Sequence, residues 1–169
     1  MLVTHSARLR LRHIEMDDAE FIMGLLNDPD FLKFVGDKNV RDLTAAQNYI
    51  RQGPVASYEN FGFGLYLVEL IDSGESIGIC GLLKRDFLEY PDLGFALMPG
   101  HCGYGYAFEA AQATLELARY VQGLQIILAF SAPDNLRSIR LLERLGMKFD
   151  TMMTLPGSDK EVKLFKSDC

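Results

Sequence analysis

LMPGHCGYGYAFEA, residues 97–110, joins an apolar run to a segment rich in alanine. Three glycines, Gly100, Gly103 and Gly105, fall within six residues, and the alanines after them are typical of a helix. A plain turn between a strand and a helix needs one or two glycines, whereas a loop whose backbone must approach a ligand may need more. The stretch therefore predicts a strand, a glycine-rich loop and a helix in direct succession, the loop being either a ligand-binding loop or a structural β–α turn.

A glycine-rich entry to a helix is suited to binding an anion, because the first N–H groups of a helix are unpaired and carry about half a positive charge. The loop that binds nucleoside triphosphates requires GxxxxGK followed by Ser or Thr, and no such lysine follows these glycines. The dinucleotide fingerprint requires GxGxxG, and Phe108 stands where its third glycine should be. A loop that binds coenzyme A is the third option.

Composition and charge restrict the class of protein. With 49% hydrophobic and 24% charged residues in 169, the chain is typical of a soluble globular protein, and we expect one domain over 1–169. A net charge of −6 argues against nucleic acid as the main partner. Cys80, Cys102 and Cys169 are widely spaced and predict neither a disulfide framework nor a metal site. We see no signal peptide and no apolar run of about 18 residues, so we expect a cytoplasmic protein without a membrane span.

Hydrophobic periodicity predicts the first half of the chain. Residues 7–14 alternate leucine with arginine, which indicates a half-buried strand whose arginines face solvent, with anion binding as the alternative. Two helices should follow, the first stopped by Pro29 and the second, near 44–52, closed by Gly53 and Pro54. Thr44 is expected to cap the second helix.

The second half is predicted as a meander followed by alternating elements. Strands are expected at 61–71, 76–86, 92–98, 124–130, 148–153 and 160–166, and helices at 105–121 and 132–147. The fold class is therefore α/β with a mixed, twisted central sheet of about seven strands flanked by about four helices.

Four segments, taken in this order and at this spacing, carry a resemblance to a known family: RLRLRHIEMDDAEFI (8–22), DLGFALMP (92–99), CGYGYAFEA (102–110) and PDNLRSIRLLERLGMKF (133–149). They resemble the GNAT superfamily of N-acetyltransferases, in particular its branch of ribosomal-protein N-terminal acetyltransferases. In that branch the similar segments form the first strand and helix, the fourth strand, the acetyl-CoA loop with the third helix, and a helix that opens with Asn-x-x-Ser.

The resemblance implies a GNAT-like fold that binds acetyl-CoA and no metal. The pantetheine arm would lie between two splayed strands, 125–130 and the one that carries Phe95, Ala96, Leu97 and Met98. Asn135 would bond the pantetheine arm, and Ser138 would lie near the thioester sulfur. Main-chain N–H groups of the loop would hold the pyrophosphate, in the segment formed by His101, Cys102, Gly103, Tyr104, Gly105, Tyr106 and Ala107.

Departures from the family concern the chemistry more than the cofactor. Leu142 stands where many members carry a tyrosine that protonates the leaving thiolate, so Ser138 or a water would have to do this. Asp92 precedes the strand motif at a position where the branch often has Glu, which makes it a candidate general base, with an ordinary strand-edge carboxylate as the alternative. Cys102 and Gly100 replace residues that are usual in the loop.

The implied reaction is direct attack of a primary amine on the thioester in a ternary complex. At pH 7 about one-tenth of an α-amine is neutral, but only about one lysine amine in 2,500. Because the sequence offers no obvious strong base, we expect a protein N-terminal α-amine as the acceptor. The alternatives are a small-molecule amine such as an aminoglycoside, polyamine or amino acid, a degenerate module that binds acetyl-CoA without turnover, and a plain interaction domain. We expect a monomer or a homodimer.

Overall fold

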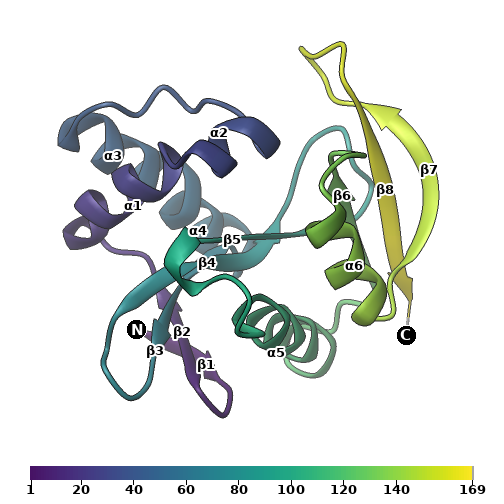
Figure 1. Cartoon of the computed structure of the whole chain (residues 1–169). Helices are drawn as coiled ribbons and strands as arrows, with labels where there is room; N and C mark the ends of the chain where they lie inside the picture. Colours follow the sequence, from purple (N-terminus) through teal and green to yellow (C-terminus); the bar gives the residue numbers. More distant parts are fainter. Residues whose placement is uncertain (169) are drawn as a thin grey trace.

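A mixed eight-stranded sheet runs through the protein, of which the computed structural model describes residues 1–168 (Figure 1). The strand order is β1-β2-β3-β4-β5-β6-β8-β7, and every neighbouring pair is antiparallel except β5 and β6. The predicted mixed sheet is confirmed, with one strand more than expected. The strands are β1 (Leu2–His5), β2 (Leu9–His13), β3 (Leu65–Leu70), β4 (Ser76–Leu83), β5 (Asp92–Leu97), β6 (Ile126–Ser131), β7 (Lys148–Thr154) and β8 (Glu161–Asp168).

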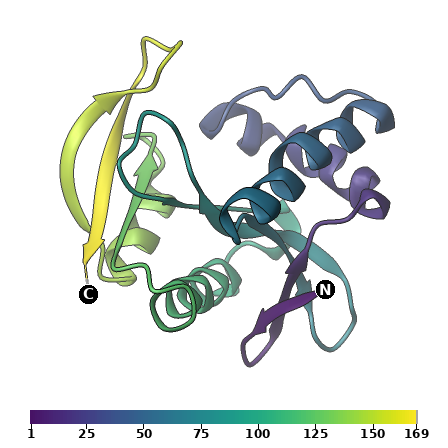
Figure 2. The same ribbon diagram turned by 180° about the vertical axis from the view of Figure 1, so that it is seen from behind.

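Helices cover both faces of the sheet (Figures 1 and 2). The first three pack on one face around an apolar cluster that includes Ile22, Ile50 and Leu67, and α4 continues from α3. The last two pack on the other face, where alanines of α5 and Leu142 of α6 share a second cluster with the sheet. The helices are α1 (Ala19–Leu26), α2 (Pro29–Phe34), α3 (Leu43–Ile50), α4 (Ala56–Phe61), α5 (Tyr106–Tyr120) and α6 (Leu136–Arg144).

The predicted stop of the first helix before Pro29 is confirmed, because α1 ends at Leu26, but the predicted end at Gly53 and Pro54 is wrong. Pro29 is the first residue of α2, where its missing N–H costs nothing, and the Asp28 carboxylate caps this helix by accepting from two N–H groups. The helix begun by α3 does not end at Pro54 but passes through a π-helical turn, Arg51–Val55, into α4. The wider turn relieves the clash that a proline ring makes with the carbonyl four residues earlier. Asp42, not Thr44, caps α3.

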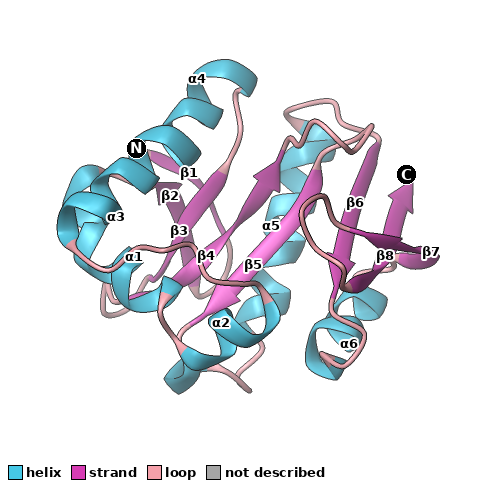
Figure 3. Cartoon of the chain, turned by 90° about the horizontal axis from the view of Figure 1, so that it is seen from above, coloured by secondary structure: helices cyan, strands magenta, loops and turns pink. Residues whose placement is uncertain are grey.

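Strands β5 and β6 separate soon after they meet (Figure 3). Their parallel pairing is recorded at one position, Asp92 opposite Leu128, supported by a 2.9 Å hydrogen bond from the Leu128 N–H to the Pro91 carbonyl. Beyond this point, within residues 1–168, the edge of β5 that faces β6 has no strand partner. We call the divergence of the two strands the fork. In residues 1–168 no helix combines the length and apolar character needed to cross a bilayer.

Candidate active site

A cavity of about 780 Å³ lies where the strands diverge, between the second half of β5 and the start of α6. Helix α2 forms part of its wall, and the glycine loop and the first turn of α5 form another. The chain after β6, not β6 itself, supplies the side opposite β5. The cavity brings together most of the predicted cofactor residues: Phe95, Ala96, Leu97, Cys102, Gly103, Gly105, Tyr106, Ala107, Asn135 and Ser138.

The glycine loop turns from a short 3₁₀ turn, Pro99–His101, into α5. Gly103 and Gly105 have φ of +89° and +83°, a left-handed conformation that favours glycine, and Gly105 directly precedes the helix. In residues 1–168 the N–H groups of Gly103, Tyr104 and Gly105 donate to no main-chain acceptor. The first N–H groups of α5 are open as well, as at any helix start. The loop therefore presents a run of free donors beside the cavity.

Other predicted loop residues contribute less to the cavity. The N–H groups of His101 and Cys102 already donate to the carbonyls of Met98 and Pro99, so we expect the anion donors to begin at Gly103. The imidazole of His101 lies 3.5 Å from the Glu75 carboxylate, and Met98 packs against the apolar cluster on the α1–α4 face. The Tyr104 side chain is 62% exposed. The cavity is lined by none of the three residues Met98, His101 and Tyr104.

The start of α6 supplies the predicted polar pair. The side-chain oxygen of Asn135 caps the helix by accepting from the Ser138 N–H at 3.3 Å, which leaves the amide NH₂ to donate to a ligand. Asn135 and Ser138 both line the cavity. Leu142 is 1% exposed within the apolar cluster under α6, so its position offers no group that could transfer a proton.

Asp92 lies at the base of the fork but does not line the cavity. Its carboxylate is 1% exposed and accepts from the Arg85 Nε at 2.9 Å. The Arg85 guanidinium also lies 4.8 Å from the centre of the Phe130 ring on β6. Burial raises the pKa of Asp92 above its ordinary value, and Arg85 opposes this shift. The pair links the end of β4, the start of β5 and β6 at the point where the strands begin to separate.

A family model supports the arrangement of loop, fork and helix. Residues 8–148 match the model of the acetyltransferase (GNAT) domain. The chain belongs to the GNAT acetyltransferase family. YkkB of Bacillus subtilis (strain 168), described as uncharacterized, is 31% identical over 146 residues, which are 84% of this chain and 83% of that one. The crystal structure of an acetyltransferase from Agrobacterium tumefaciens strain C58 superposes with a TM-score of 0.84 at 28% identity and covers 100% of this chain and 95% of that one.

More distant GNAT structures show the same fold. RimL, a ribosomal L7/L12 α-N-protein acetyltransferase solved with coenzyme A, has a TM-score of 0.78 at 14% identity and covers 99% of this chain and 98% of its own. Spermidine N-acetyltransferase from Vibrio cholerae, solved with CoA and spermine, has a TM-score of 0.79 at 18% identity and covers 95% of each chain. The expectation of an N-acetyltransferase is confirmed, whereas these two structures bear on the fold alone.

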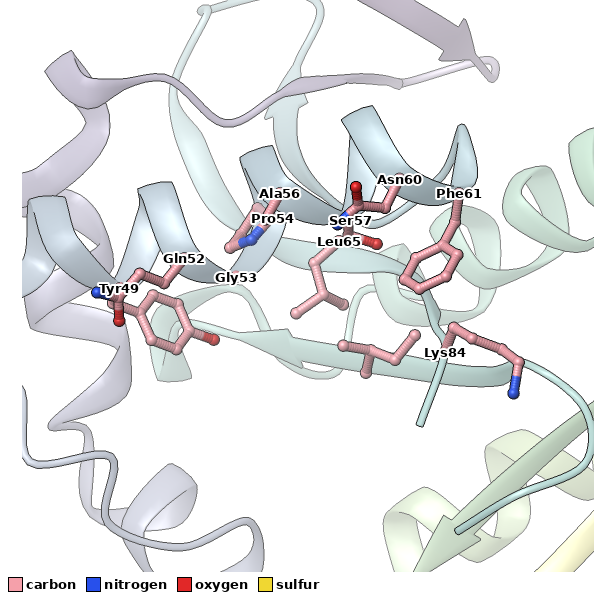
Figure 4. A pocket seen from close by; sticks show the side chains of 11 residues that line it. Tyr49, Gln52, Gly53, Pro54, Ala56, Ser57, Asn60, Phe61, Leu65 and Lys84 are labelled. Atoms are coloured by element: carbon pink, nitrogen blue, oxygen red, sulfur yellow. The ribbon is translucent and has the colours of Figure 1, made fainter. Parts of the chain in front are cut away.

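A second, smaller cavity of about 260 Å³ lies on the α3–α4 side of this GNAT fold (Figure 4). Tyr49 and Phe61 come from the helices above it, and Leu65 and Lys84 lie at the strand side. Leu83, which also lines this cavity, pairs with Asp92 across β4 and β5, so the cavity adjoins the base of the fork. Burial raises the pKa of the Tyr49 hydroxyl, which therefore stays protonated at neutral pH.

The sequence did not reveal the partners of the arginines in β2 and just before it, Arg8, Arg10 and Arg12. Arg10 and Arg12 form ion pairs with Glu69, so the expected solvated face is largely an ion-paired one. The Arg8 Nε donates to the Glu109 carboxylate at 2.8 Å, and the Arg8 N–H and the Ser6 hydroxyl donate to its other oxygen. We call Ser6, Arg8 and Glu109 the Glu109 clamp. It ties the β1–β2 turn to the first turns of α5, and no local signal could pair residues 101 positions apart.

We expect Glu109→Gln to weaken the hold on the start of α5. Burial acts to raise the pKa of Glu109, but the hydrogen bonds from Ser6 and Arg8 hold it below its ordinary value. The charged clamp therefore stabilises the fold above pH 4.5, the ordinary pKa, and this contribution is lost as the pH falls through the lowered folded value. At pH 7 the variant should lose about 1–2 kcal/mol in urea unfolding, and its KM for acetyl-CoA should rise several-fold with little change in kcat.

Glu116→Gln is the matched control for this variant, because Glu116 lies exposed on the same helix. It should leave stability and KM close to the wild-type values. A Glu109→Gln protein with unchanged stability and unchanged KM would show that the clamp does not hold α5.

Proposed function

We propose that the protein transfers acetyl from acetyl-CoA to a protein N-terminal α-amine by direct attack within a ternary complex. The observation that carries this proposal is the cavity at the fork, where free N–H groups of the glycine loop, apolar side chains of β5 and the Asn135 amide meet. Acetyl-CoA consists of an anionic head, an apolar arm with amide groups and a thioester. Each of these parts has a matching wall of the cavity.

Residues of this chain have separate roles in the proposed site. The N–H groups of 103–107 bind the pyrophosphate, as a helix N-terminus with a glycine loop does for phosphates elsewhere. The amide NH₂ of Asn135 donates to a carbonyl of the pantetheine arm. As the C–S bond breaks, Ser138, on the same turn of α6, donates its hydroxyl proton to the leaving thiolate and regains a proton from the amine nitrogen, each directly or through a water.

The unpaired edge of β5 supplies the electrostatic part of the mechanism. Main-chain N–H groups there have no strand partner beyond Asp92 and can donate to the carbonyl oxygen as negative charge develops on it. Binding both substrates in one orientation supplies roughly 7–11 kcal/mol of the rate enhancement. These N–H groups are fixed by the pairing of β5 with β4, so they need no reorganisation during the reaction.

The acceptor is inferred from the bases that the site lacks. In the described part of the chain no histidine lines either cavity. Of the three carboxylates at the larger cavity, Asp28 is engaged as the cap of α2, and Asp30 and Asp134 are exposed to solvent. Asp92 is held by Arg85, and we assign it a positioning role at the base of the fork. An amine with a pKa near 7.7–8.0 needs less help from a base than a lysine near 10.4. RimL, an α-N-protein acetyltransferase, is an example of this fold with such an acceptor.

A small-molecule amine is the second candidate acceptor. The cavity of about 260 Å³ under α3 and α4 adjoins the base of the fork and is lined by Tyr49, Phe61 and Leu65, which suits a small ligand. The spermidine enzyme shows that an amine of this size can be acetylated on the same fold.

Thiol release from acetyl-CoA tests both candidates in one assay. The panel contains a peptide with a free α-amine, the same peptide with a blocked α-amine and one lysine, spermidine and an aminoglycoside. We expect kcat/KM for the free α-amine to exceed that for the lysine by about 250-fold, in line with their neutral fractions at pH 7. A preference for the lysine peptide, spermidine or the aminoglycoside would refute the α-amine assignment. Acetyl-CoA binding without turnover on any amine would instead indicate a degenerate module.

A further inference from the structure

The α6 side of the large cavity carries three arginines. Arg137, Arg140 and Arg144 are spaced by three and four residues, so they share one face of the helix, and all three line the cavity. Lys33, on α2, lines the same cavity. These cations are side-chain groups, whereas the donors of the glycine loop are main-chain groups.

None of these four cations forms an ion pair with a carboxylate within residues 1–168. Arginines elsewhere in the molecule, such as Arg8, Arg12 and Arg85, each pair with one. Acidic side chains are present at the cavity, namely Asp28, Asp30 and Asp134, yet they leave the arginines unpaired. A chain with a net charge of −6 therefore carries, within residues 1–168, three guanidinium groups without ion pairs at one cavity wall. This pattern is typical of a site for an anionic ligand.

Arg144 is held in place without a carboxylate. Its guanidinium carbon lies 4.3 Å from the centre of the Phe108 ring. Phe108 belongs to α5, one turn after Gly105, and also lines the cavity. The stacking places a fixed, fully charged donor group beside the start of α5 while its N–H groups stay available.

From this geometry we infer that Arg144 and Arg140 form a subsite for a phosphomonoester, the 3′-phosphate on the ribose of coenzyme A. The inference rests on the proposed function, because the pyrophosphate must occupy the glycine loop. Main-chain N–H groups there serve the pyrophosphate, whereas a phosphomonoester carries about −1.5 to −2 charges at pH 7 and is best matched by arginine forks. The subsite selects coenzyme A over dephospho-CoA.

Calorimetric titration of the full chain with coenzyme A and with dephospho-CoA tests the subsite at fixed salt. The wild type should bind coenzyme A about 10–100-fold more tightly than dephospho-CoA, as expected for one or two hydrogen bonds between charged groups. In the double variant Arg140→Gln, Arg144→Gln this ratio of affinities should disappear, because only the affinity for coenzyme A is weakened. Arg51→Gln is the control, because Arg51 is exposed, lacks a carboxylate partner and lines neither cavity.

Three results would overturn the inference, and they separate it from the proposed function. Equal affinity of the wild type for both ligands would show that no 3′-phosphate subsite exists, while the proposed function would stand. An equal loss of affinity for both ligands in the double variant would show that the arginines bind the pyrophosphate or act only through the overall electrostatic potential. Failure of the wild type to bind either ligand would overturn the proposed function together with the subsite. The wild-type comparison needs no variant, so a folding defect cannot obscure it.

Discussion

Replacing Gly105 with valine is expected to abolish acetyl-CoA binding while the chain stays folded. Gly105 has φ of +83° and stands directly before α5, and a left-handed conformation costs most L-residues about 1–2 kcal/mol and a β-branched one more. A Cβ there would also lie 3.4 Å from the Arg8 Nη2, in the Glu109 clamp. The loop must rearrange to relieve this strain, and its N–H groups then no longer point at one anion. We expect the Kd for acetyl-CoA to rise by more than about 100-fold.

Thermal unfolding with and without acetyl-CoA measures this effect. At 100 times the Kd the ligand should stabilise the wild type by about 2.7 kcal/mol and the variant not at all. Gly157→Val is the matched control, because Gly157 has φ of +77° in the β7–β8 turn and lines neither cavity. This control suffers similar backbone strain and should keep its response to acetyl-CoA. Retained binding in the Gly105 variant would contradict the assigned role of the loop.

Local patterns predicted the parts of the site that lie close together in the sequence. The glycine spacing in 97–110 depends on backbone conformation, and Gly103 and Gly105 do adopt positive φ. The alternating leucines of 7–14 are fully buried in β2, as period-two patterning requires. The Asn-x-x-Ser segment begins α6 as expected because an asparagine cap acts within one turn.

Errors arose where one residue type permits two structures. Proline was taken as a helix terminator, which Pro54 contradicts because it lies inside a π-helical turn, and the short helix α2 that Pro29 begins was missed. Strand β1 was missed because its four residues show no clear alternation, and it is recognised only by its pairing with β2.

Pairings distant in sequence could not be predicted at all. No local signal marked Glu109, because its partner Arg8 is 101 positions away. Asp92 was a candidate base or an ordinary strand-edge carboxylate, and only the fold shows that it is buried against Arg85. The acceptor amine depends on the walls of two cavities formed by segments far apart in the chain, which no single motif encodes.

Removing the guanidinium with Arg85→Met is expected to destabilise the protein by about 3 kcal/mol at pH 7. The change leaves the Asp92 carboxylate buried at the base of the fork without its counter-charge, and breaking a buried pair in this way typically costs about 3–5 kcal/mol. Contact with Phe130 is lost too, so the junction of β4, β5 and β6 loosens. Urea unfolding measures the loss. Arg41→Met, which breaks the exposed pair with Asp37, is the control and should leave stability close to the wild type.

The pH dependence identifies the cause of the loss. Burial already raises the pKa of Asp92 in the wild type, and without Arg85 it must rise further. The folded variant then binds a proton more readily than the unfolded chain, so its deficit exists above the raised folded pKa and shrinks as the pH falls through it. A deficit that stays constant from pH 7 to mildly acidic pH would show that lost packing, not the unpaired carboxylate, is responsible.

Asp92→Asn separates positioning by Asp92 from catalysis. The amide removes the buried charge and keeps the shape, while Arg85, with 31% of its side chain exposed, can be solvated. We therefore expect a loss of about 1 kcal/mol and a kcat/KM within about 10-fold of the wild type. General-base catalysis is worth about 10²–10⁴-fold, so a folded Asp92→Asn protein whose kcat falls by more than about 100-fold would make Asp92 the base. Because the carboxylate is committed to Arg85 outside the large cavity, the smaller effect is the expected one.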